Sequence, residues 1–343
     1  MRLGILTGGG DCPGLNAVIR AVVRRGIHAH GMEFVGFHDG WNGVLDDVSQ
    51  PLGIADTTGI LPRGGTILGS SGANPYHVEG GTEKVLATVA SHELDGLIAI
   101  GGEGTLGAAA RLADEEGLRI VGIPKTIDND LGGTDVTVGF HTAVQVAADA
   151  IDRLHTTAES HDRVMLVEVM GRHAGWIAVY AGIAGGADAI LIPEQPFDLD
   201  EICHHLRHRH ASRSSFSIVV VAEGALPKEG TLVLPMPPLD ENGFPRLGGV
   251  TNHLAPEIER RTGFQTRVTI LGHVQRGGTP VSFDRVLATR FGVAAADLAA
   301  AGGWGRMVAR KAQDVRDVPI AEAVAERNIV PVELYREAAV FFG

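Results

Sequence analysis

Short apolar segments alternate with helical segments along the whole chain, and this alternation limits the folds that are open to it. Strand-length apolar segments lie at 3–7, 97–100, 120–123, 164–169, 189–192, 216–222 and 268–274. Helical periodicity is clearest at 16–25, 142–156, 200–209 and 251–261. Alternating strands and helices predict an α/β fold with mostly parallel, doubly wound sheets. At 343 residues the chain is long enough for two such lobes with a cleft between them.

Composition excludes several classes of partner. The 47 glycines are about twice the usual share, which predicts many backbone turns close to ligands. A net charge of −12 repels nucleic acid and anionic membranes, so an anionic substrate needs a local group of cations. Cys12 and Cys203 lack the spacing of a zinc site or a disulfide framework. No apolar run has membrane-spanning length and no signal-peptide core is present, so we expect a cytoplasmic protein.

The stretch Ile120–Asp130, I-V-G-I-P-K-T-I-D-N-D, is the strongest candidate for chemistry. Its strand should end near Pro124, which has no N–H to donate to a central ladder. Thr126, Asp128 and Asp130 follow at alternate positions, so in an extended chain their side chains share one face. Two carboxylates and a hydroxyl past the carboxyl end of a strand suit a metal, a cation or a substrate. A solvated turn is the alternative, because Asp-Asn-Asp is ordinary turn chemistry.

Two glycine loops follow predicted strands and open predicted helices. Residues 8–14, G-G-G-D-C-P-G, have the strand–loop–helix arrangement in which backbone N–H groups bind phosphate, but no Walker A Gly-Lys-Ser/Thr follows. The second loop contains G-x-G-x-x-G at Gly102, Gly104 and Gly107. A dinucleotide site needs an acidic residue about twenty positions further on, where this chain has Pro-Lys-Thr. The dehydrogenase interpretation is therefore disfavoured.

Four arginines flank two predicted strands in the same way. Arg163 and Arg172 flank V-M-L-V-E-V-M-G, and Arg267 and Arg276 flank V-T-I-L-G-H-V-Q. The members of each pair are nine residues apart, which is about 30 Å in a strand. One small phosphate cannot reach both members within one subunit, so we hypothesise that Arg163 and Arg267 serve a site of a neighbouring chain. Arginines that simply flank strands in solvent are the alternative.

Other polar side chains lie at or near the ends of the same strands. Glu168, the segment M-G-R from Met170, Glu223 and His273 supply carboxylate, guanidinium and imidazole groups. Guanidinium groups suit phosphate and carboxylates suit sugar hydroxyls, so the set fits a polyhydroxylated phosphate ester.

Four histidines on one predicted helix form an apparent metal cluster: His204, His205, His208 and His210. Arginines, Arg213 among them, surround these histidines, so we interpret the cluster as a solvated helix face. The Pro- and Gly-rich segment 228–248 predicts a hairpin or an excursion.

Together, T-I-D-N-D, G-G-E-G-T, M-G-R and G-H-V-Q-R-G-G resemble the motifs of bacterial 6-phosphofructokinases. The resemblance runs from Leu3 to about Arg290 and includes the mixed-substrate, actinobacterial-like subgroup of the ATP-dependent enzymes. It implies two Rossmann-like domains with the active site in the cleft between them. The larger, phosphoryl-donor domain would comprise 1–139 plus about 275–325, and the smaller, sugar-phosphate domain 140–274 plus about 326–343. It also implies a homotetramer, or at least a homodimer, in which two subunits complete each fructose 6-phosphate pocket.

The resemblance implies a role for each matching residue. Asp128 would be the base that accepts the proton of the sugar 1-hydroxyl, with Thr126 and Arg172 as further catalytic residues. Magnesium would lie near Glu103 and Asp130. The sugar phosphate would be bound by Thr126, Asp128, Asp130, Arg163, Met170, Gly171, Arg172, Glu223, Arg267, His273 and Arg276. The nucleotide would be bound by Gly10, Gly102, Glu103, Gly104 and Thr105.

Three positions bear on the phosphoryl donor. Lys125 stands where the common ATP-dependent enzymes have glycine and pyrophosphate-dependent ones have lysine. Gly104 is the ATP-type residue, since pyrophosphate users usually have aspartate there, and Gly72 replaces an arginine of many ATP-dependent members. Because Gly104 leaves room for an α-phosphate, we predict transfer from ATP to fructose 6-phosphate with Mg²⁺, with pyrophosphate as the alternative donor. A non-catalytic sugar-phosphate-binding regulator would have lost the base, and Asp128 is present.

Overall fold

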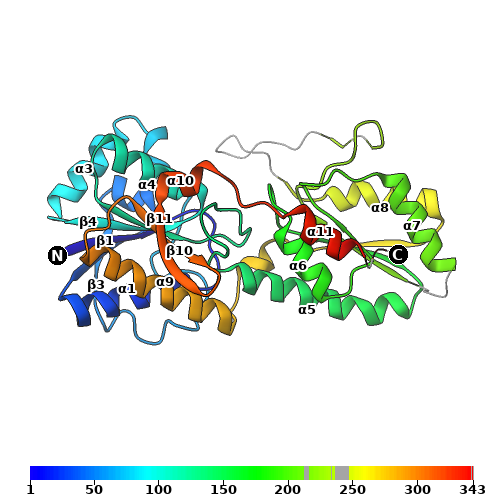
Figure 1. Cartoon of the computed structure of the whole chain (residues 1–343), viewed down its shortest axis with the longest axis horizontal. Helices are drawn as coiled ribbons and strands as arrows, with labels where there is room; N and C mark the ends of the chain where they lie inside the picture. Colours follow the sequence, from blue (N-terminus) through cyan, green and yellow to red (C-terminus); the bar gives the residue numbers. More distant parts are fainter. Residues whose placement is uncertain (212–215, 233, 236–246, 341, 343) are drawn as a thin grey trace. The chain divides into compact units, whose positions relative to one another are not determined.

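The computed structural model describes residues 1–211, 216–232, 234–235, 247–340 and 342, which divide into two compact units. Unit 1 comprises Met1–Thr142 and Arg276–Asn328, and unit 2 comprises Ala143–Gln275 and Ile329–Gly343. The chain therefore passes between the units three times, after residues 142, 275 and 328. Figure 1 shows the elements of each unit, coloured along the chain.

Unit 1 is built on a seven-stranded sheet. Its strands are β1 Arg2–Thr7, β2 Glu33–Phe37, β3 Ser49–Leu52, β4 Gly96–Gly101, β5 Ile120–Pro124, β10 Arg306–Lys311 and β11 Asp314–Pro319. They lie in the order β11-β10-β5-β4-β1-β2-β3. The five strands from β10 to β2 pair in parallel, and each edge ends in an antiparallel pair, β2 with β3 and β10 with β11.

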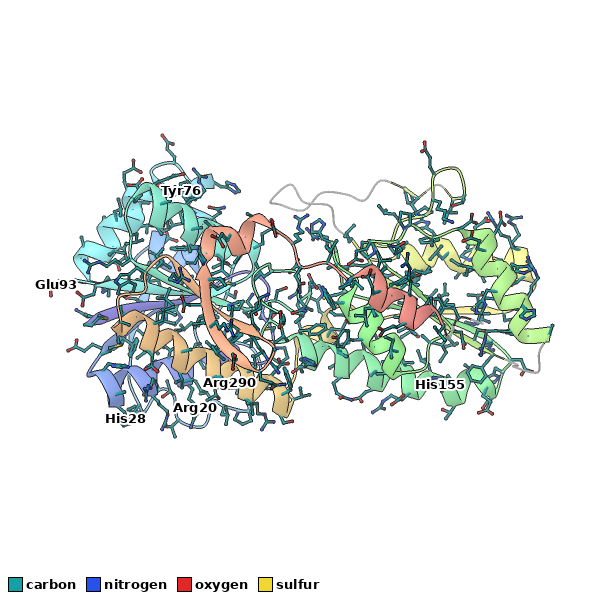
Figure 2. All side chains as sticks on the ribbon, in the orientation of Figure 1. Arg20, His28, Tyr76, Glu93, His155 and Arg290 are labelled. Carbon is teal, nitrogen blue, oxygen red and sulfur yellow. The ribbon has the colours of Figure 1, made fainter. Side chains whose placement is uncertain are left out.

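Helices cover both faces of this sheet (Figure 1). They are α1 Leu15–His30, α2 Trp41–Leu45, α3 Gly81–Ser91, α4 Glu103–Glu115, α9 Ser282–Ala300 and α10 Ile320–Ala325, with the 3-10 helix η1 Pro75–His77. Leu6, Trp41 and Leu106 are among the fully buried side chains of its core. The turn η1 packs on α4, where the Arg111 guanidinium lies 3.6 Å from the centre of the Tyr76 ring (Figure 2). This core fixes the strand ends from which the candidate site loops emerge.

Unit 2 is built on a smaller, all-parallel sheet. Its strands are β6 Val164–Val169, β7 Ala189–Leu191, β8 Ser217–Ala222 and β9 Thr266–Ile270, in the order β7-β8-β6-β9. Its helices are α5 Phe140–Glu159, which begins in unit 1, α6 Trp176–Ala184, α7 Leu199–Ala211, α8 Val250–Thr262 and α11 Val332–Ala339. Leu206 of α7 and Leu254 of α8 are fully buried together with Val219 of β8. The β9 strand is an edge strand and is the most exposed of the four.

The predicted doubly wound α/β architecture is confirmed, with two differences. The segment 268–274 is not one strand, because β9 ends at Ile270 and the 3-10 helix η2 Gly272–Arg276 follows. Gly272 has a φ of 50°, so the chain turns there. The antiparallel edge pairs β2–β3 and β10–β11 were not predicted. Residues 233 and 236–246 of the predicted excursion at 228–248 lie outside the described residues.

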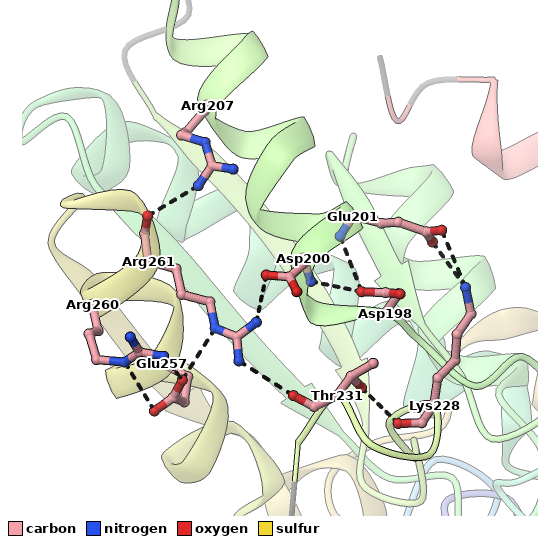
Figure 3. A network of polar contacts seen from close by, with 9 residues as sticks. All are labelled: Asp198, Asp200, Glu201, Arg207, Lys228, Thr231, Glu257, Arg260 and Arg261. Atoms are coloured by element: carbon pink, nitrogen blue, oxygen red, sulfur yellow. Dashed lines mark hydrogen bonds and ion pairs between the residues drawn. The ribbon is translucent and has the colours of Figure 1, made fainter.

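Charged side chains on α7 and α8 pair with one another (Figure 3). Arg261 Nη1 lies 2.7 Å from Asp200 Oδ1, and Arg261 Nε lies 3.3 Å from Glu257 Oε2. Lys228 Nζ lies 3.2 Å from Glu201 Oε2. Such pairs near the surface contribute little to the free energy of unfolding individually. They do, however, give Arg261 and Lys228 carboxylate partners within unit 2. Within the described part of the chain, no helix combines the length and apolar character needed to cross a membrane.

Candidate active site

The carboxyl ends of β1, β4 and β5 bring three loops of unit 1 to one edge of its sheet. Backbone hydrogen bonds extend the pairing: Gly8 N–H donates to Ile100 O at 3.0 Å, and Lys125 N–H donates to Gly101 O at 2.9 Å. The loops contain Gly10, the G-G-E-G-T segment and T-I-D-N-D. Parallel α/β sheets bind ligands at this edge. The structure therefore brings together the candidate residues that belong to these three loops.

The T-I-D-N-D segment forms a turn after the end of β5. Thr126, Asp128 and Asp130 are half-buried and alternate with buried neighbours, but the chain is not extended as the shared-face prediction assumed, because Asp128 N–H donates to Thr126 Oγ1 at 3.1 Å. The turn is fixed by Asn129, whose φ is 53° and whose Oδ1 accepts a hydrogen bond from Thr137 N–H at 2.9 Å. Sequence reasoning missed Thr137, whose hydroxyl donates to Thr126 O at 2.6 Å. The loop is thus held in shape by side chains outside the motif.

Lys125 lies beneath the first glycine loop. Its side chain is only 2% exposed, and Nζ donates a hydrogen bond to Gly10 O at 2.5 Å. Burial lowers the pKa of the Lys125 ammonium. The neighbouring Cys12 is fully buried, and burial raises the pKa of its thiol to about 12, so it remains a neutral thiol. Cys12 therefore adds no negative charge beside Lys125.

Arg276 lies against the same glycine loop. Its Nη1 donates a hydrogen bond to Asp11 O at 3.2 Å. A Cβ built on Gly10 would lie 2.5 Å from Arg276 Nη1, so position 10 must remain glycine for the guanidinium to lie there. Lys125 and Arg276 together place two cationic side chains beside the backbone of residues 9–11.

The second glycine loop, G-G-E-G-T, leads directly into the first turn of α4. Thr105 is buried between the other loops: a Cβ on Gly8 would lie 2.5 Å from its Oγ1, and one on Gly101 would lie 2.4 Å from its Cβ. Gly102 precedes the helix as its N-cap, and Glu103 and Gly104 are exposed. A Cβ on Gly104 would have no atom within 4 Å. The turn therefore has exposed N-terminal amides with open space beside Gly104, which favours an anion.

Glu103 and Asp130 are the predicted magnesium residues. Glu103 Oε2 pairs with Arg327 Nη2 at 3.3 Å, and Asp130 lies on the neighbouring loop. Among the described residues, no group of three or more Asp, Glu, His or Cys side chains could hold a metal by itself. Magnesium is usually held by one or two carboxylates together with substrate phosphates. Glu103 would have to leave Arg327 to join Asp130 at an ion that arrives with the donor.

A pocket of about 520 Å³ opens beside the first glycine loop. Gly9 N–H donates to Ser71 O at 2.8 Å, which fixes the pocket wall to the loop. A volume of this size is typical of small-molecule sites. The sequence analysis assigns Gly10 and Gly72 to the donor side but gives no role to the serines of this wall, Ser70 and Ser71. The pocket is lined by Gly9, Gly10, Asp11, Thr66, Gly69, Ser70, Ser71 and Gly72.

The carboxyl ends of β6 and β8 in unit 2 bring the M-G-R loop and Glu223 together. Glu223 N–H donates to Val169 O at 2.9 Å, and Gly224 N–H donates to Gly171 O at 3.1 Å. A Cβ on Gly224 would lie 2.1 Å from Arg172 O, so the two loops are in direct contact. Met170 N–H donates to the buried Gln275 Oε1 at 3.3 Å. His273, exposed in η2, belongs to the segment that contains Gln275.

The proposed ligand role of Glu168 was wrong. Its side chain is only 1% exposed, and its carboxylate accepts hydrogen bonds from Gly249 N–H, Thr251 N–H and Thr251 Oγ1 at 2.5, 3.0 and 2.6 Å. These donors belong to the start of α8. A carboxylate at this position complements the N-terminus of the helix and leaves no exposed group for a sugar. Glu168 is therefore a structural residue.

Arg163 and Arg267 lie at the amino ends of β6 and β9, whereas the M-G-R loop follows the carboxyl end of β6. Arg163 directly precedes β6, and Val164 pairs with Thr266, the residue before Arg267. The nine-residue strands assumed from the sequence are shorter in the structure, six residues in β6 and five in β9. The length of β6 still separates Arg163 from Met170 by about 20 Å. Neither arginine can share a small ligand with the M-G-R loop of its own chain.

The histidines of α7 do not form a metal centre. His204 and His208 are exposed, as in the solvated helix face that the sequence suggested. His205 and His210 are half-buried instead, and the His210 ring stacks on Phe264 at a centroid distance of 3.9 Å. Burial lowers the pKa of both half-buried imidazoles. Arg213, which the sequence places beside this cluster, lies outside the described residues.

Comparison with known proteins identifies the family. The family described as Phosphofructokinase matches residues 2–299. The chain belongs to the phosphofructokinase family. The pyrophosphate–fructose 6-phosphate 1-phosphotransferase of Amycolatopsis mediterranei is 59% identical over 100% of both chains. The ATP-dependent 6-phosphofructokinase of Mycobacterium tuberculosis H37Rv is 54% identical, also over 100% of both. The T-state crystal structure of Pichia pastoris phosphofructokinase has 33% identity and a TM-score of 0.83, over 99% of this chain and 36% of that one.

These matches confirm the resemblance that the motifs indicate. Phosphofructokinases are phosphotransferases of glycolysis, with fructose 6-phosphate and a phosphoryl donor as their substrates, and they generally use magnesium. Relatives of similar identity are named for different donors, pyrophosphate in one case and ATP in the other. Family membership therefore establishes the phosphofructokinase character and leaves the donor to the details of the site.

Proposed function

We propose that this phosphofructokinase transfers the γ-phosphoryl group of ATP to the 1-hydroxyl of fructose 6-phosphate, giving fructose 1,6-bisphosphate and ADP. The observation that carries the choice of donor is the open space beside Gly104, where an added Cβ would meet nothing within 4 Å. This space adjoins the N-terminal amides of α4, which favour phosphate. It suits the α-phosphate that a nucleotide has and pyrophosphate lacks.

In this proposal unit 1 supplies the base and the charge that phosphoryl transfer needs. Asp128 accepts the proton of the sugar 1-hydroxyl, and its half-buried neighbours Thr126 and Asp130 support it. Glu103 and Asp130 would hold magnesium, which when bound lowers the charge of the donor phosphates. Lys125, which is hydrogen-bonded to Gly10 O, adds positive charge beneath the glycine loop. This charge replaces that of the arginine which many ATP-dependent members have at position 72, where this chain has glycine.

Unit 2, together with Arg276 of unit 1, supplies the residues for fructose 6-phosphate. Met170, Gly171, Arg172 and Glu223 are brought together by the contact between their two loops, and we assign them the sugar. His273 and Arg276 are assigned the 6-phosphate. Because Arg163 and Arg267 lie at the other edge of the sheet, we assign them to the pocket of a neighbouring subunit. The assembly would then be a homotetramer, or at least a homodimer.

Pyrophosphate is the second candidate donor. Position 125 is lysine, as in the pyrophosphate-dependent enzymes. The relative from Amycolatopsis mediterranei is named for that donor. A cation this close to the glycine loop stabilises any phosphate bound there, whether or not a nucleoside is attached. This observation supports pyrophosphate without excluding the nucleotide.

The donor is tested by assaying the purified enzyme with magnesium, fructose 6-phosphate and either ATP or pyrophosphate, side by side. We expect efficient turnover with ATP and little or none with pyrophosphate. Robust activity with pyrophosphate and none with ATP would overturn the proposal.

A matched pair of variants tests the reason for the choice. Gly104→Asp should lower kcat/KM for ATP by about 100-fold or more, because a like charge beside a phosphate costs several kcal/mol. Gly107→Asp is the control, since Gly107 lies on the same helix and also has nothing within 4 Å of its Cβ position. The control should stay within about threefold of wild type. Equal losses in both variants would show that the open space beside Gly104 does not determine nucleotide use.

A further inference from the structure

The third passage of the chain between the units begins on the T-I-D-N-D loop. Asn328, the last residue of unit 1, donates from Nδ2 to Asn129 O at 2.8 Å and from its backbone N–H to Asp130 O at 3.0 Å. Its neighbour Arg327 pairs with Leu131 in an antiparallel bridge. Residues 327–328 therefore lie along the loop that carries Asp128 and fix its backbone from outside the motif.

Two residues further on, the same segment is anchored in unit 2. Val330 N–H donates to Glu194 Oε1 at 2.9 Å. The same carboxylate accepts a hydrogen bond from Gly175 N–H, at 3.0 and 3.1 Å to its two oxygens. Gly175 is the N-cap of α6 and ends the loop that begins with Met170, Gly171 and Arg172. Glu194 thus joins Val330 to the M-G-R loop.

We call residues 327–330 the linking strap; Figure 1 draws it as part of the orange-red trace between α10 and α11. The Cα atoms of Asn328 and Val330 are at most about 7 Å apart, because only one residue separates them. Ile329 between them is 52% exposed, so the strap is held by its two anchors rather than by burial of its centre. A displacement of either anchored loop must therefore pull on the other or break a hydrogen bond.

The second passage between the units repeats this arrangement. Gln275 accepts the N–H of Met170, and the next residue, Arg276, donates to Asp11 O of the glycine loop. Two independent passages thus connect the M-G-R loop of unit 2 to a phosphate-side loop of unit 1. Because the arrangement is duplicated, cutting one connection should weaken the coupling rather than abolish it.

We propose that Asn328 and Glu194 are positioning residues, which couple the T-I-D-N-D loop to the M-G-R loop through the linking strap. Each loop is thereby ordered in part by the short segment that also orders the other. The catalytic meaning of the coupling rests on the proposed function, since it requires that the base lies on one loop and the sugar contacts on the other. The mechanical coupling itself does not depend on the donor.

Hydrogen exchange tests the coupling without any turnover. Asn328→Ala, changed in unit 1, should raise amide exchange at 170–175 in unit 2, and Glu194→Ala should raise it at 126–131 in unit 1, each about threefold or more. Asn74→Ala and Glu259→Ala are the controls, because each also removes a hydrogen bond between a side chain and the backbone, in unit 1 and unit 2 respectively, and neither residue belongs to the linking strap or its anchors. Changes confined to the unit that carries the substitution would overturn the proposal, whatever donor the enzyme uses.

Kinetics test whether the coupling serves catalysis, with the donor that wild type uses. Each single variant should lower kcat about tenfold while KM for fructose 6-phosphate changes less than about threefold, since small misplacements of reacting groups are costly. The kcat of the double variant should be no lower than that of the less active single variant, because either change breaks the same connection. Glu194→Gln should keep most activity, since one oxygen at the Oε1 position can accept from both Val330 and Gly175. Multiplicative losses, or losses equal to those of the controls, would overturn the positioning role.

Discussion

Replacing Lys125 by methionine isolates the contribution of its buried cation. Methionine has a similar length and is unbranched, so it can fill the same buried space without the charge. The change removes the hydrogen bond from Nζ to Gly10 O at 2.5 Å, and a hydrogen bond to a charged group contributes about 1.5–3 kcal/mol. If this energy acts on the bound donor, kcat/KM for ATP should fall roughly 10- to 150-fold.

The structure also predicts what Lys125→Met should leave unchanged. Gly10 is exposed, so water can replace the lost hydrogen-bond donor. Methionine is uncharged, so burying it carries none of the free-energy cost of burying an ammonium group. The melting temperature should therefore not fall by more than a few degrees. KM for fructose 6-phosphate should stay within about twofold.

Steady-state kinetics with each substrate varied separately, together with thermal unfolding, check these expectations. Lys311→Met is the control, because that lysine is 47% exposed and pairs with Asp135 at 3.2 Å. A loss below about threefold, or an equal effect on fructose 6-phosphate, would refute the role of Lys125 at the donor.

Two further predictions concern assembly and pH. Arg163→Ala and Asp128→Asn variants, each inactive alone, should regain partial activity after mixing and subunit exchange; no complementation despite proven exchange would contradict a shared site. His141 packs on Phe283 at a ring distance of 3.9 Å, and burial, with the Arg310 charge, lowers its pKa from 6.5 to about 4. The unfolded chain then binds more protons between these values, so stability falls as pH drops from 6.5 to 4. His141→Phe should flatten this part of the unfolding-pH profile, and an unchanged slope would refute it.

The parts of the fold that follow local rules were predictable from the sequence. Strands such as β1, β4, β5 and β6 are short apolar runs that end at or just before a glycine or proline, and this pattern distinguishes them from loops. The edge strand β3 has no such run, because Ser49–Leu52 includes a glutamine and a proline. The end of β9 was misplaced since V-T-I-L-G-H-V-Q looks continuous in sequence, whereas the positive φ of Gly272 turns the chain.

The site was predictable only as far as motifs reach. Asp128 and its neighbours are recognisable because they lie next to each other in the chain. Glu168 has the same appearance, a carboxylate near a strand end, but its partners are 81 and 83 residues away and turn it into a helix-capping group. Asn328 carried no signal, because the loop that it holds lies 199 residues earlier. Contacts at such separations depend on the folded chain and are not encoded in any local pattern.

The measurement that tests this account most directly is turnover of Asp128→Asn beside its affinity for fructose 6-phosphate. Asparagine keeps the shape of the side chain but cannot accept the proton, so kcat should fall about 10²–10⁴-fold while fructose 6-phosphate binds nearly as in wild type. Asp135→Asn is the control, because Asp135 is exposed and pairs with Lys311; it should keep nearly full turnover. If Asp128→Asn kept more than about a tenth of wild-type turnover, Asp128 would not be the base and the T-I-D-N-D loop would not be the centre of the reaction.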